Sequence, residues 1–145
     1  MFKSIIVLLA LVAAVAVASS GVPTVTNCSP GNVIFTNLNY TWWPNNVQPG
    51  AKLYIKFSGD LTQTASALPI HLVAALDGLP IINKVINICP FLQGGLTCPV
   101  APGPITHQMD WYIPQLPLPG SIVFTVTLRD QTAAELVCIN IALNI

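Results

Sequence analysis

The chain has 145 residues, which is enough for one domain and too short for two ordinary ones. Charged residues make up only 7% of it, the formal net charge is zero and the mean hydropathy is +0.69, well to the apolar side of an average soluble domain. Its few lysines and arginines are scattered, so neither a nucleic acid nor a strongly anionic membrane surface is an expected partner.

The first residues have the pattern of a secretory signal peptide. Lys3 supplies a positive start, residues 5–18 are apolar, and Ala16-Val17-Ala18 offers small side chains for cleavage. We expect residues 1–20 to be removed and residues 21–145 to form the mature domain in the secreted, endosomal or lysosomal compartment. An uncleaved anchor is the alternative, which the shortness of the apolar stretch disfavours, since a span needs about 20 residues.

Prolines and glycines punctuate the rest of the chain and favour an all-β fold. Thirteen prolines and nine glycines leave runs that are too short for long helices. The first strands are expected over residues 24–28 and 33–42. Residues 52–57 then alternate between apolar and charged or tyrosine side chains, which is typical of a half-buried strand.

Four further strands are expected in the second half of the sequence. Residues 103–114, 122–129 and 137–145 alternate with period two, whereas residues 69–76 are apolar enough to leave their facing ambiguous. Turn sequences such as Asp77-Gly78 separate the apolar runs. About seven short strands at this spacing predict a β-sandwich of two antiparallel sheets.

The cysteine count favours disulfides. Four cysteines behind a signal peptide would meet an oxidising compartment, and they allow three pairings. The short spacing favours one of these pairings, in which the disulfides are Cys89–Cys98 and Cys28–Cys138. A zinc site is the alternative, but neither the cysteine spacing nor the two histidines, His71 and His107, match the usual ligand pattern. We therefore expect no metal and no cofactor.

Motifs that carry catalysis are missing from the sequence. It contains no G-x-S-x-G elbow, no H-E-x-x-H pair and no glycine-rich phosphate loop. Its five acidic residues are too few for a convincing pair of catalytic carboxylates. A binding function is favoured over an enzymatic one.

Several short sequence motifs occur along the chain in an order that resembles that of a known family. They are Cys28, Pro49-Gly50, Asp77-Gly78-Leu79-Pro80, Cys89, Cys98-Pro99, Tyr112-Ile113-Pro114, Pro119-Gly120 and Leu136-Val137-Cys138. Their order and spacing, over nearly the whole mature chain, resemble the ML family of MD-2-related lipid-recognition proteins. That family includes Niemann-Pick type C2-like and phosphatidylglycerol/phosphatidylinositol transfer-like proteins.

The resemblance implies an immunoglobulin-like β-sandwich with a cavity between its two sheets. The cavity would hold a lipid, which is either a sterol or a phospholipid. Such a protein would exchange its lipid with membranes through transient contact, and we expect it to be a monomer. One departure affects the rim of the cavity. Many family members carry a third, short-range disulfide in the loop after the second strand, where this chain has residues 42–46.

Inward-facing apolar residues of the predicted strands are the candidates for lining the lipid cavity. They are Leu53, Ile55, Phe57, Leu72, Met109, Trp111, Ile113, Phe124, Val126 and Ile139. Aliphatic and aromatic walls with few polar groups suit a hydrocarbon guest. For each residue taken singly, ordinary core packing is the competing interpretation, because a collapsed sandwich needs the same alternation.

Two adjacent tryptophans, Trp42 and Trp43, form the most distinctive local feature. Neighbouring residues of a strand point to opposite faces, so one indole is expected to be exposed. That ring could contact a membrane at the cavity portal, stack on a sugar, or cover one end of the sandwich. Asn39-Tyr40-Thr41 is a glycosylation sequon on the polar face of the same strand, which makes Asn39 a candidate glycosylation site.

Two functional alternatives stay open at this point. A secreted β-sandwich could bind carbohydrate or another protein through its surface, with Trp42 or Trp43 as the platform. A co-receptor, also within the resembled family, would use the lipid as a signal and not as cargo. The residues do not distinguish sterol from phospholipid, because aliphatic walls discriminate weakly among hydrocarbons.

Overall fold

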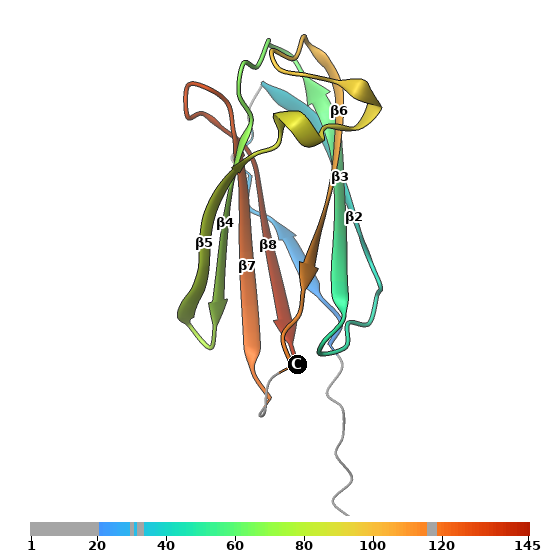
Figure 1. Ribbon diagram of the computed structural model, residues 1–145, viewed down its shortest axis with the longest axis vertical. Coiled ribbons are helices and arrows are strands. Elements are labelled where there is room, and N and C mark those ends of the chain that lie inside the picture. Colours follow the sequence, from blue (N-terminus) through green and yellow to red (C-terminus); the bar gives the residue numbers. More distant parts are fainter. Residues whose placement is uncertain (1–20, 30, 32–33, 116–118) are drawn as a thin grey trace, which may run out of the picture.

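Two antiparallel sheets face each other in the computed structural model, which describes residues 21–29, 31, 34–115 and 119–145 (Figure 1). The five-stranded sheet has the order β1-β8-β7-β4-β5 and the three-stranded sheet has the order β2-β3-β6. The strands are β1 (Thr24–Asn27), β2 (Phe35–Trp43), β3 (Lys52–Leu61), β4 (Pro69–Leu76), β5 (Leu79–Asn87), β6 (Gly103–Tyr112), β7 (Ser121–Arg129) and β8 (Glu135–Asn144). The expected all-β sandwich is confirmed. The expected signal peptide, residues 1–20, lies outside the described residues.

The alternation seen in the sequence determines which side chains form the core. Along β3, Leu53, Ile55 and Phe57 are all buried, whereas the alternate residues Lys52 and Lys56 are exposed. On β8 the inward residues from Val137 to Leu143 are likewise buried at every second position. Because successive side chains of a strand point to opposite faces, the inward faces of the two sheets supply a shared apolar core.

One strand, β5, was not expected from the sequence. Residues 79–87 carry apolar side chains on both faces, so they lack the period-two alternation that identifies a half-buried strand. In the structure β5 follows the Asp77-Gly78 turn, pairs with β4 and forms one edge of the five-stranded sheet. Apart from Ile82, all of its residues are exposed. This edge borders the pocket described below.

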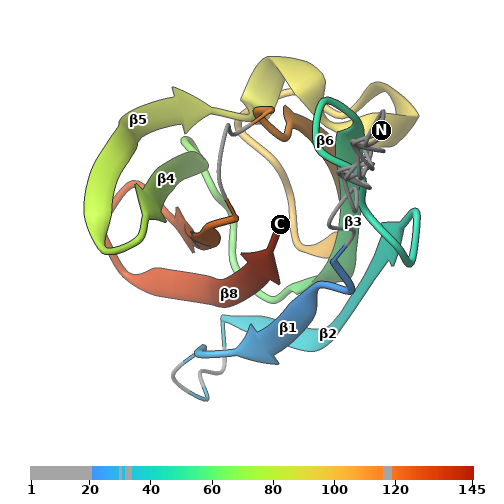
Figure 2. The ribbon, with the colours of Figure 1, turned by 90° about the horizontal axis from the view of Figure 1, so that it is seen from below.

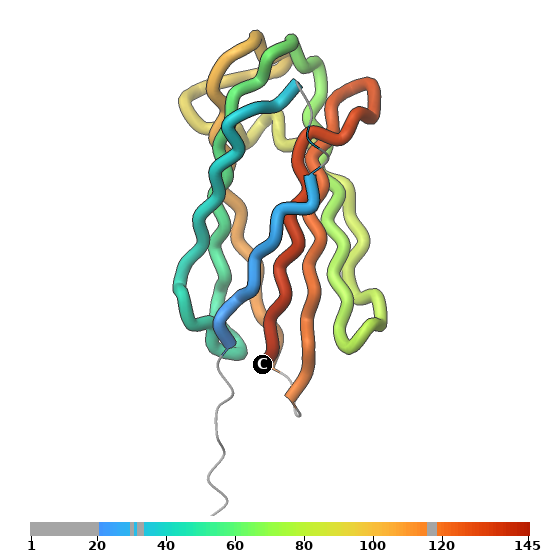
Figure 3. The backbone as a smooth tube through the Cα atoms, turned by 180° about the vertical axis from the view of Figure 1, so that it is seen from behind, coloured from blue at the N-terminus to red at the C-terminus, as the bar shows by residue number. Residues whose placement is uncertain are grey.

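The two sheets approach each other along one side of the sandwich. Gly21, just before β1, forms a bridge with Val47, which follows β2, and Figure 3 shows β1 lying between β2 and β8. On the other side, the chain crosses from β5 to β6 through two short 3-10 turns, η1 (Cys89–Phe91) and η2 (Gln93–Gly95), which lie near one end of the sandwich, between β5 and β6 (Figures 1 and 2).

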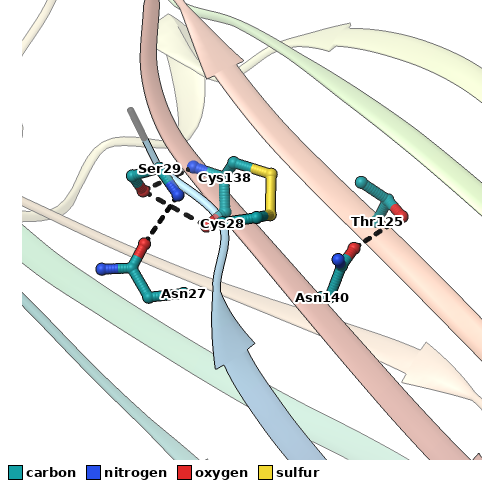
Figure 4. The surroundings of a disulfide bond; sticks show 6 residues. All are labelled: Asn27, Cys28, Ser29, Thr125, Cys138 and Asn140. Carbon is teal, nitrogen blue, oxygen red and sulfur yellow. Dashed lines mark hydrogen bonds between the residues drawn. A yellow bond between two sulfur atoms is a disulfide. The ribbon is translucent and has the colours of Figure 1, made fainter. Parts of the chain in front are cut away.

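The structure contains two disulfides, Cys28–Cys138 and Cys89–Cys98. This is the pairing that the cysteine spacing favours. The first joins the residue after β1 to β8 (Figure 4). Beside it, the Cys138 amide donates to Ser29 Oγ at 2.8 Å, and the Ser29 amide donates to Asn27 Oδ1 at 2.8 Å. The second disulfide closes the crossing segment that contains η1 and η2.

Candidate functional site

An apolar pocket of about 330 Å³ lies between the two sheets on the side where β4 and β5 face β6. Its lining comes from both sheets and from η1: Ile70, Leu72, Ile86, Ile88, Phe91, His107, Gln108, Met109, Asp110 and Trp111. This volume is near the lower end of the range for pockets that hold small organic ligands, which is about 300–1,000 Å³. The pocket can therefore accommodate the apolar part of a small guest.

Strand register explains why these residues meet. On β4, Ile70 and Leu72 are inward-facing and buried, and Ile86 of β5 lies directly opposite Ile70. On β6, the inward positions His107, Met109 and Trp111 form the facing wall. Directly opposite residues of an antiparallel pair share a face, so the walls follow from the pairing of the strands.

Exposed apolar side chains form the mouth of the pocket. Ile86 is 44% exposed and Phe91 is 63% exposed, yet both line the pocket. Gln108 and Asp110 of β6 also border the pocket, but they alternate with the inward residues of this edge strand, and Asp110 pairs with Lys52 at 2.8 Å. The opening is thus apolar toward β5 and η1, and polar residues of β6 border it.

Three of the ten residues expected to line a cavity are brought together in this pocket: Leu72, Met109 and Trp111. The other seven are buried in the hydrophobic core and do not line it: Leu53, Ile55, Phe57, Ile113, Phe124, Val126 and Ile139. Contact of these seven with a guest stays a prediction that depends on the sheets moving apart. The pocket is displaced from the centre of the sandwich toward its β5 side.

Sequence reasoning missed most of the wall formed by β4, β5 and η1. Ile70, Ile86, Ile88 and Phe91 line the pocket, and none of them was a candidate. The available signal was the apolar run after the Asp77-Gly78 turn, which continues up to Cys89. Without period-two alternation, that run did not reveal which of its side chains face the other sheet.

His107 is the one lining residue with a buried, unsatisfied polar atom among the described residues. The residue is 6% exposed, its ring packs at an angle of 60° to that of Phe57 with the ring centroids 5.7 Å apart, and its Nδ1 has no hydrogen-bond partner. Burial lowers the pKa of His107 below the ordinary value of 6.5, and a backbone interaction with Phe91 opposes this in part. The imidazole therefore favours its neutral form inside this apolar wall.

Trp42 and Trp43 lie away from the pocket, on edge strand β2, and β3 separates them from β6. Trp42 is half-buried and stacks on Tyr40 with ring centroids 6.3 Å apart. Trp43 is 39% exposed and stacks on Tyr54 at 5.2 Å. One indole is exposed, as expected, but neither borders the mouth of the pocket, and a membrane contact by these residues stays a prediction.

Asn39 is exposed on the outer face of the three-stranded sheet, beside Thr41, Lys56 and Ser58. Its position leaves room for a glycan, and modification of Asn39 stays a prediction. A separate hollow of about 410 Å³ lies on the outer side of the five-stranded sheet, bordered by polar side chains that include His71, Arg129 and Asp130. Its border also includes the apolar residues Ala67, Pro69, Val85 and Ala133, and it lies outside the sandwich and not between the sheets.

Within residues 21–29, 31, 34–115 and 119–145, no helix has the length and apolar character needed to cross a bilayer. Over the same ranges, no three histidine, cysteine or acidic side chains gather as ligands for a metal ion.

Comparison with known proteins places this architecture in a family. Residues 23–145 match the model of the ML domain. Two proteins of Dictyostelium discoideum named "Putative phosphatidylglycerol/phosphatidylinositol transfer protein" are 29% and 24% identical over 120 residues, which is 83% of this chain and 84% of each relative.

Solved structures share the fold at low sequence identity. A Niemann-Pick type C2 protein from the Japanese carpenter ant superposes with a TM-score of 0.57 at 10% identity, covering 81% of this chain and 96% of that one. Chicken MD-1, solved in complex with lipid IVa, superposes with a TM-score of 0.55 at 12% identity, covering 86% and 96%. These likenesses show the shared fold. The match over residues 23–145 shows that the chain belongs to the ML domain family.

Proposed function

We propose that this protein holds a lipid in the pocket between β4–β5 and β6 and carries it between membranes. The observation that carries the proposal is the apolar 330 Å³ pocket, open between the sheets of a chain that belongs to the lipid-binding ML family. Transfer by binding and release needs no catalytic group, and the proposed function is not enzymatic.

The energetics of lipid transfer explain why such a pocket is useful. Exposing an acyl chain to water costs about 0.8 kcal/mol per methylene, so a sixteen-carbon chain costs on the order of 13 kcal/mol. Ile70, Leu72 and Met109 replace part of the lost hydrocarbon contact. The wall beyond Trp111 is packed core, so a long chain would extend through the mouth or require the sheets to separate.

The guest is proposed to be a phospholipid or a sterol. The names of the Dictyostelium relatives support a phospholipid such as phosphatidylglycerol or phosphatidylinositol, and the fold likeness to the ant Niemann-Pick type C2 protein keeps a sterol as the alternative. A hydrocarbon wall distinguishes these classes weakly, because hydrophobic contact is non-directional.

Lipid exchange is proposed to occur where apolar side chains are exposed beside the pocket. Leu79, Ile81, Val85 and Ile86 of β5, with Phe91 of η1, are each at least 44% exposed, and we call them the apolar rim. Ile86 and Phe91 belong to both the rim and the pocket wall. Val85 lies opposite His71 on the outer face of β5, so the rim includes both faces of this edge strand and reaches the mouth at Ile86 and Phe91. A bilayer in contact with this edge would give a lipid a path that avoids water.

The cellular setting follows from the same proposal. We infer that residues 1–20 are a removed signal peptide and that residues 21–145 act in the secreted, endosomal or lysosomal compartment. Two disulfides support an oxidising route of synthesis. Within this setting the protein is proposed to act as a monomer with a glycan on Asn39.

Lipid extraction tests the proposal. The protein, secreted from a eukaryotic host and purified without detergent, is expected to release about one lipid per chain into organic solvent, quantified by mass spectrometry. Met109→Trp should fill the pocket and lower that ratio several-fold, whereas Val123→Trp, on the outer face of β7, should leave it unchanged. An empty protein that keeps glycan affinity after solvent treatment would instead support a surface-binding function.

A further inference from the structure

Lys84 occupies an unusual position for a charged residue, on the inward face of β5. It lies directly opposite Leu72, while its neighbours at two residues' distance, Ile82 and Ile86, lie opposite Ala74 and Ile70. Ile70, Leu72 and Ile86 line the pocket. Residues that pair directly across antiparallel strands share a face, so the Lys84 side chain starts from the same surface as the pocket wall.

The other described cations are placed differently. Lys52 pairs with Asp110 at 2.8 Å, and this carboxylate raises the pKa of Lys52. Lys56 lies on the outer face of β3, and Arg129 is at the outer side of the five-stranded sheet. Among the described residues, Lys84 is the one cation that shares a face with the pocket wall, and no ion pair occupies it there.

We propose that Lys84 binds the phosphate of a phospholipid whose acyl chain occupies the pocket, and so makes the protein selective for phospholipids over uncharged lipids. The inference rests on the proposed lipid-carrier function and adds a specificity residue to it. Ile86 and Ile88 lie two and four residues beyond Lys84, about 7 and 13 Å along an extended chain. A phosphate at Lys84 thus places the first acyl carbons at Ile86 and the later ones at Ile88.

The chemistry of the lysine side chain suits a lipid whose phosphate lies at Lys84 and whose acyl chain lies in the pocket. The lysine ammonium group offers three donors on a flexible stem, and the stem can lie along Leu72 while the charged head stays at the solvent boundary. A charge-assisted hydrogen bond to a phosphate oxygen is stronger than a neutral one. The competing explanation is that an inward-pointing lysine on an edge strand protects that edge from pairing with other chains.

The test compares two lipids with identical acyl chains, phosphatidylglycerol and diacylglycerol. The full protein, secreted and delipidated, is incubated with phosphatidylcholine vesicles that contain both lipids in equal amounts, and the lipid it retains is measured by mass spectrometry. Lys84→Gln should lower the ratio of phosphatidylglycerol to diacylglycerol by about three- to tenfold. Lys56→Gln removes the same charge from the other sheet and should keep the wild-type ratio.

Each outcome decides between the explanations. An unchanged ratio in Lys84→Gln overturns the phosphate contact while lipid uptake itself continues to support the carrier function. An unchanged ratio accompanied by oligomers assigns Lys84 to edge protection alone and also overturns it. If the wild type takes up neither lipid, the carrier function itself fails. Free glycerol phosphate in excess should not displace phosphatidylglycerol, and displacement would assign Lys84 to soluble phosphates instead.

Discussion

Trp111 of β6 and Phe124 of β7 stack across the two sheets, with ring centroids 5.0 Å apart and ring planes 4° from parallel. Trp111 lines the pocket, whereas Phe124 is 2% exposed and belongs to the core. The aromatic pair therefore marks the boundary between the hollow part of the sandwich, toward β5, and its packed part. Its size sets how far a guest can reach between the sheets.

Shortening this aromatic pair should enlarge the pocket. Trp111→Leu removes the ring that limits the pocket on the Phe124 side, so the lipids retained should shift toward longer or bulkier chains. The lost packing should lower the free energy of unfolding by about 2–4 kcal/mol. Acyl composition by mass spectrometry and urea unfolding measure the two effects. Tyr112→Leu, a neighbouring residue that is 63% exposed, is the control and should change neither.

Burial of His107 should make the stability of the fold depend on pH. Its folded-state pKa is lowered from 6.5, so below about pH 6.5 the unfolded chain binds more protons than the folded chain. The free energy of unfolding should then fall as the pH decreases through 6.5 toward the lowered pKa. Urea unfolding from about pH 7.5 to pH 5 should show this loss, and His107→Leu should reduce it.

The change in the free energy of unfolding caused by His107→Leu at neutral pH is a second test of the role of His107. Removing the unpartnered Nδ1 relieves a cost of about 1–3 kcal/mol, but the replacement also loses the ring contact with Phe57 and the backbone interaction with Phe91. These effects oppose each other, so His107→Leu should change the stability at pH 7.5 by less than about 1 kcal/mol. Equal pH slopes for His107→Leu and the wild type would contradict the account.

Protonation of Asp130 should lower the stability of the fold in a pH range below that of His107. Burial acts to raise the pKa of Asp130, but hydrogen bonds from Thr132 and the Ala134 amide outweigh it and hold the pKa below 3.8. Stability from these bonds is present above about pH 3.8 and is lost as the pH falls through the folded-state pKa. Asp130→Asn should therefore flatten the unfolding profile below pH 4 and leave the His107 range unchanged, as measured by thermal unfolding.

The two disulfides should contribute unequally to stability and to binding. In the chain-entropy model the Cys28–Cys138 bond, with a sequence separation of 110, contributes about 4–5 kcal/mol, and the Cys89–Cys98 bond, with a separation of 9, about 3 kcal/mol. Cys28→Ala/Cys138→Ala should give the larger loss in urea. Cys89→Ala/Cys98→Ala should instead weaken lipid retention more, because its loop carries Phe91; equal retention by both variants would contradict this.

Lipid exchange with membranes should depend on the apolar rim more than on the tryptophans. Val85→Ser removes an apolar side chain that is 67% exposed and does not line the pocket, so it should slow transfer of a fluorescent lipid between vesicles without changing the amount bound at equilibrium. Trp43→Ser, on the far edge of the other sheet, should leave the rate unchanged. The reverse result would place membrane contact at Trp43.

Period-two alternation made the β-sandwich predictable from the sequence. Because β5 lacks this alternation, the pocket beside it was not predicted. Residues 52–57 and 137–145 have one polar and one apolar face, so their facing could be predicted from the sequence and is confirmed. β5 mixes apolar and polar side chains on both faces, so neither its existence nor the inward position of Ile86 could be predicted. Which inward residues touch each other and which border a space depends on how closely the sheets approach, and a single sequence contains no direct signal for that distance.

The same reasoning explains the candidate site. Leu72, Met109 and Trp111 were predicted as cavity residues and line the pocket, whereas residues such as Val126 and Ile139 share their pattern but are packed. The sequence could predict which side chains point inward, but not which of them border the pocket and which pack in the core. The pocket lies where β5 and β6, the edge strands of the two sheets, are joined by the segment that contains η1 and η2. The prolines and glycines of that segment do not reveal how far apart it holds the two strands.

Native mass spectrometry of the secreted, glycan-trimmed protein tests the central claim most directly, because it weighs the protein together with any guest it holds. The account predicts a main species heavier than the polypeptide by the mass of one lipid, which dissociates on activation, and a Met109→Trp protein that is predominantly empty. A wild-type protein that carries no lipid after secretion, and acquires none from vesicles, would contradict it.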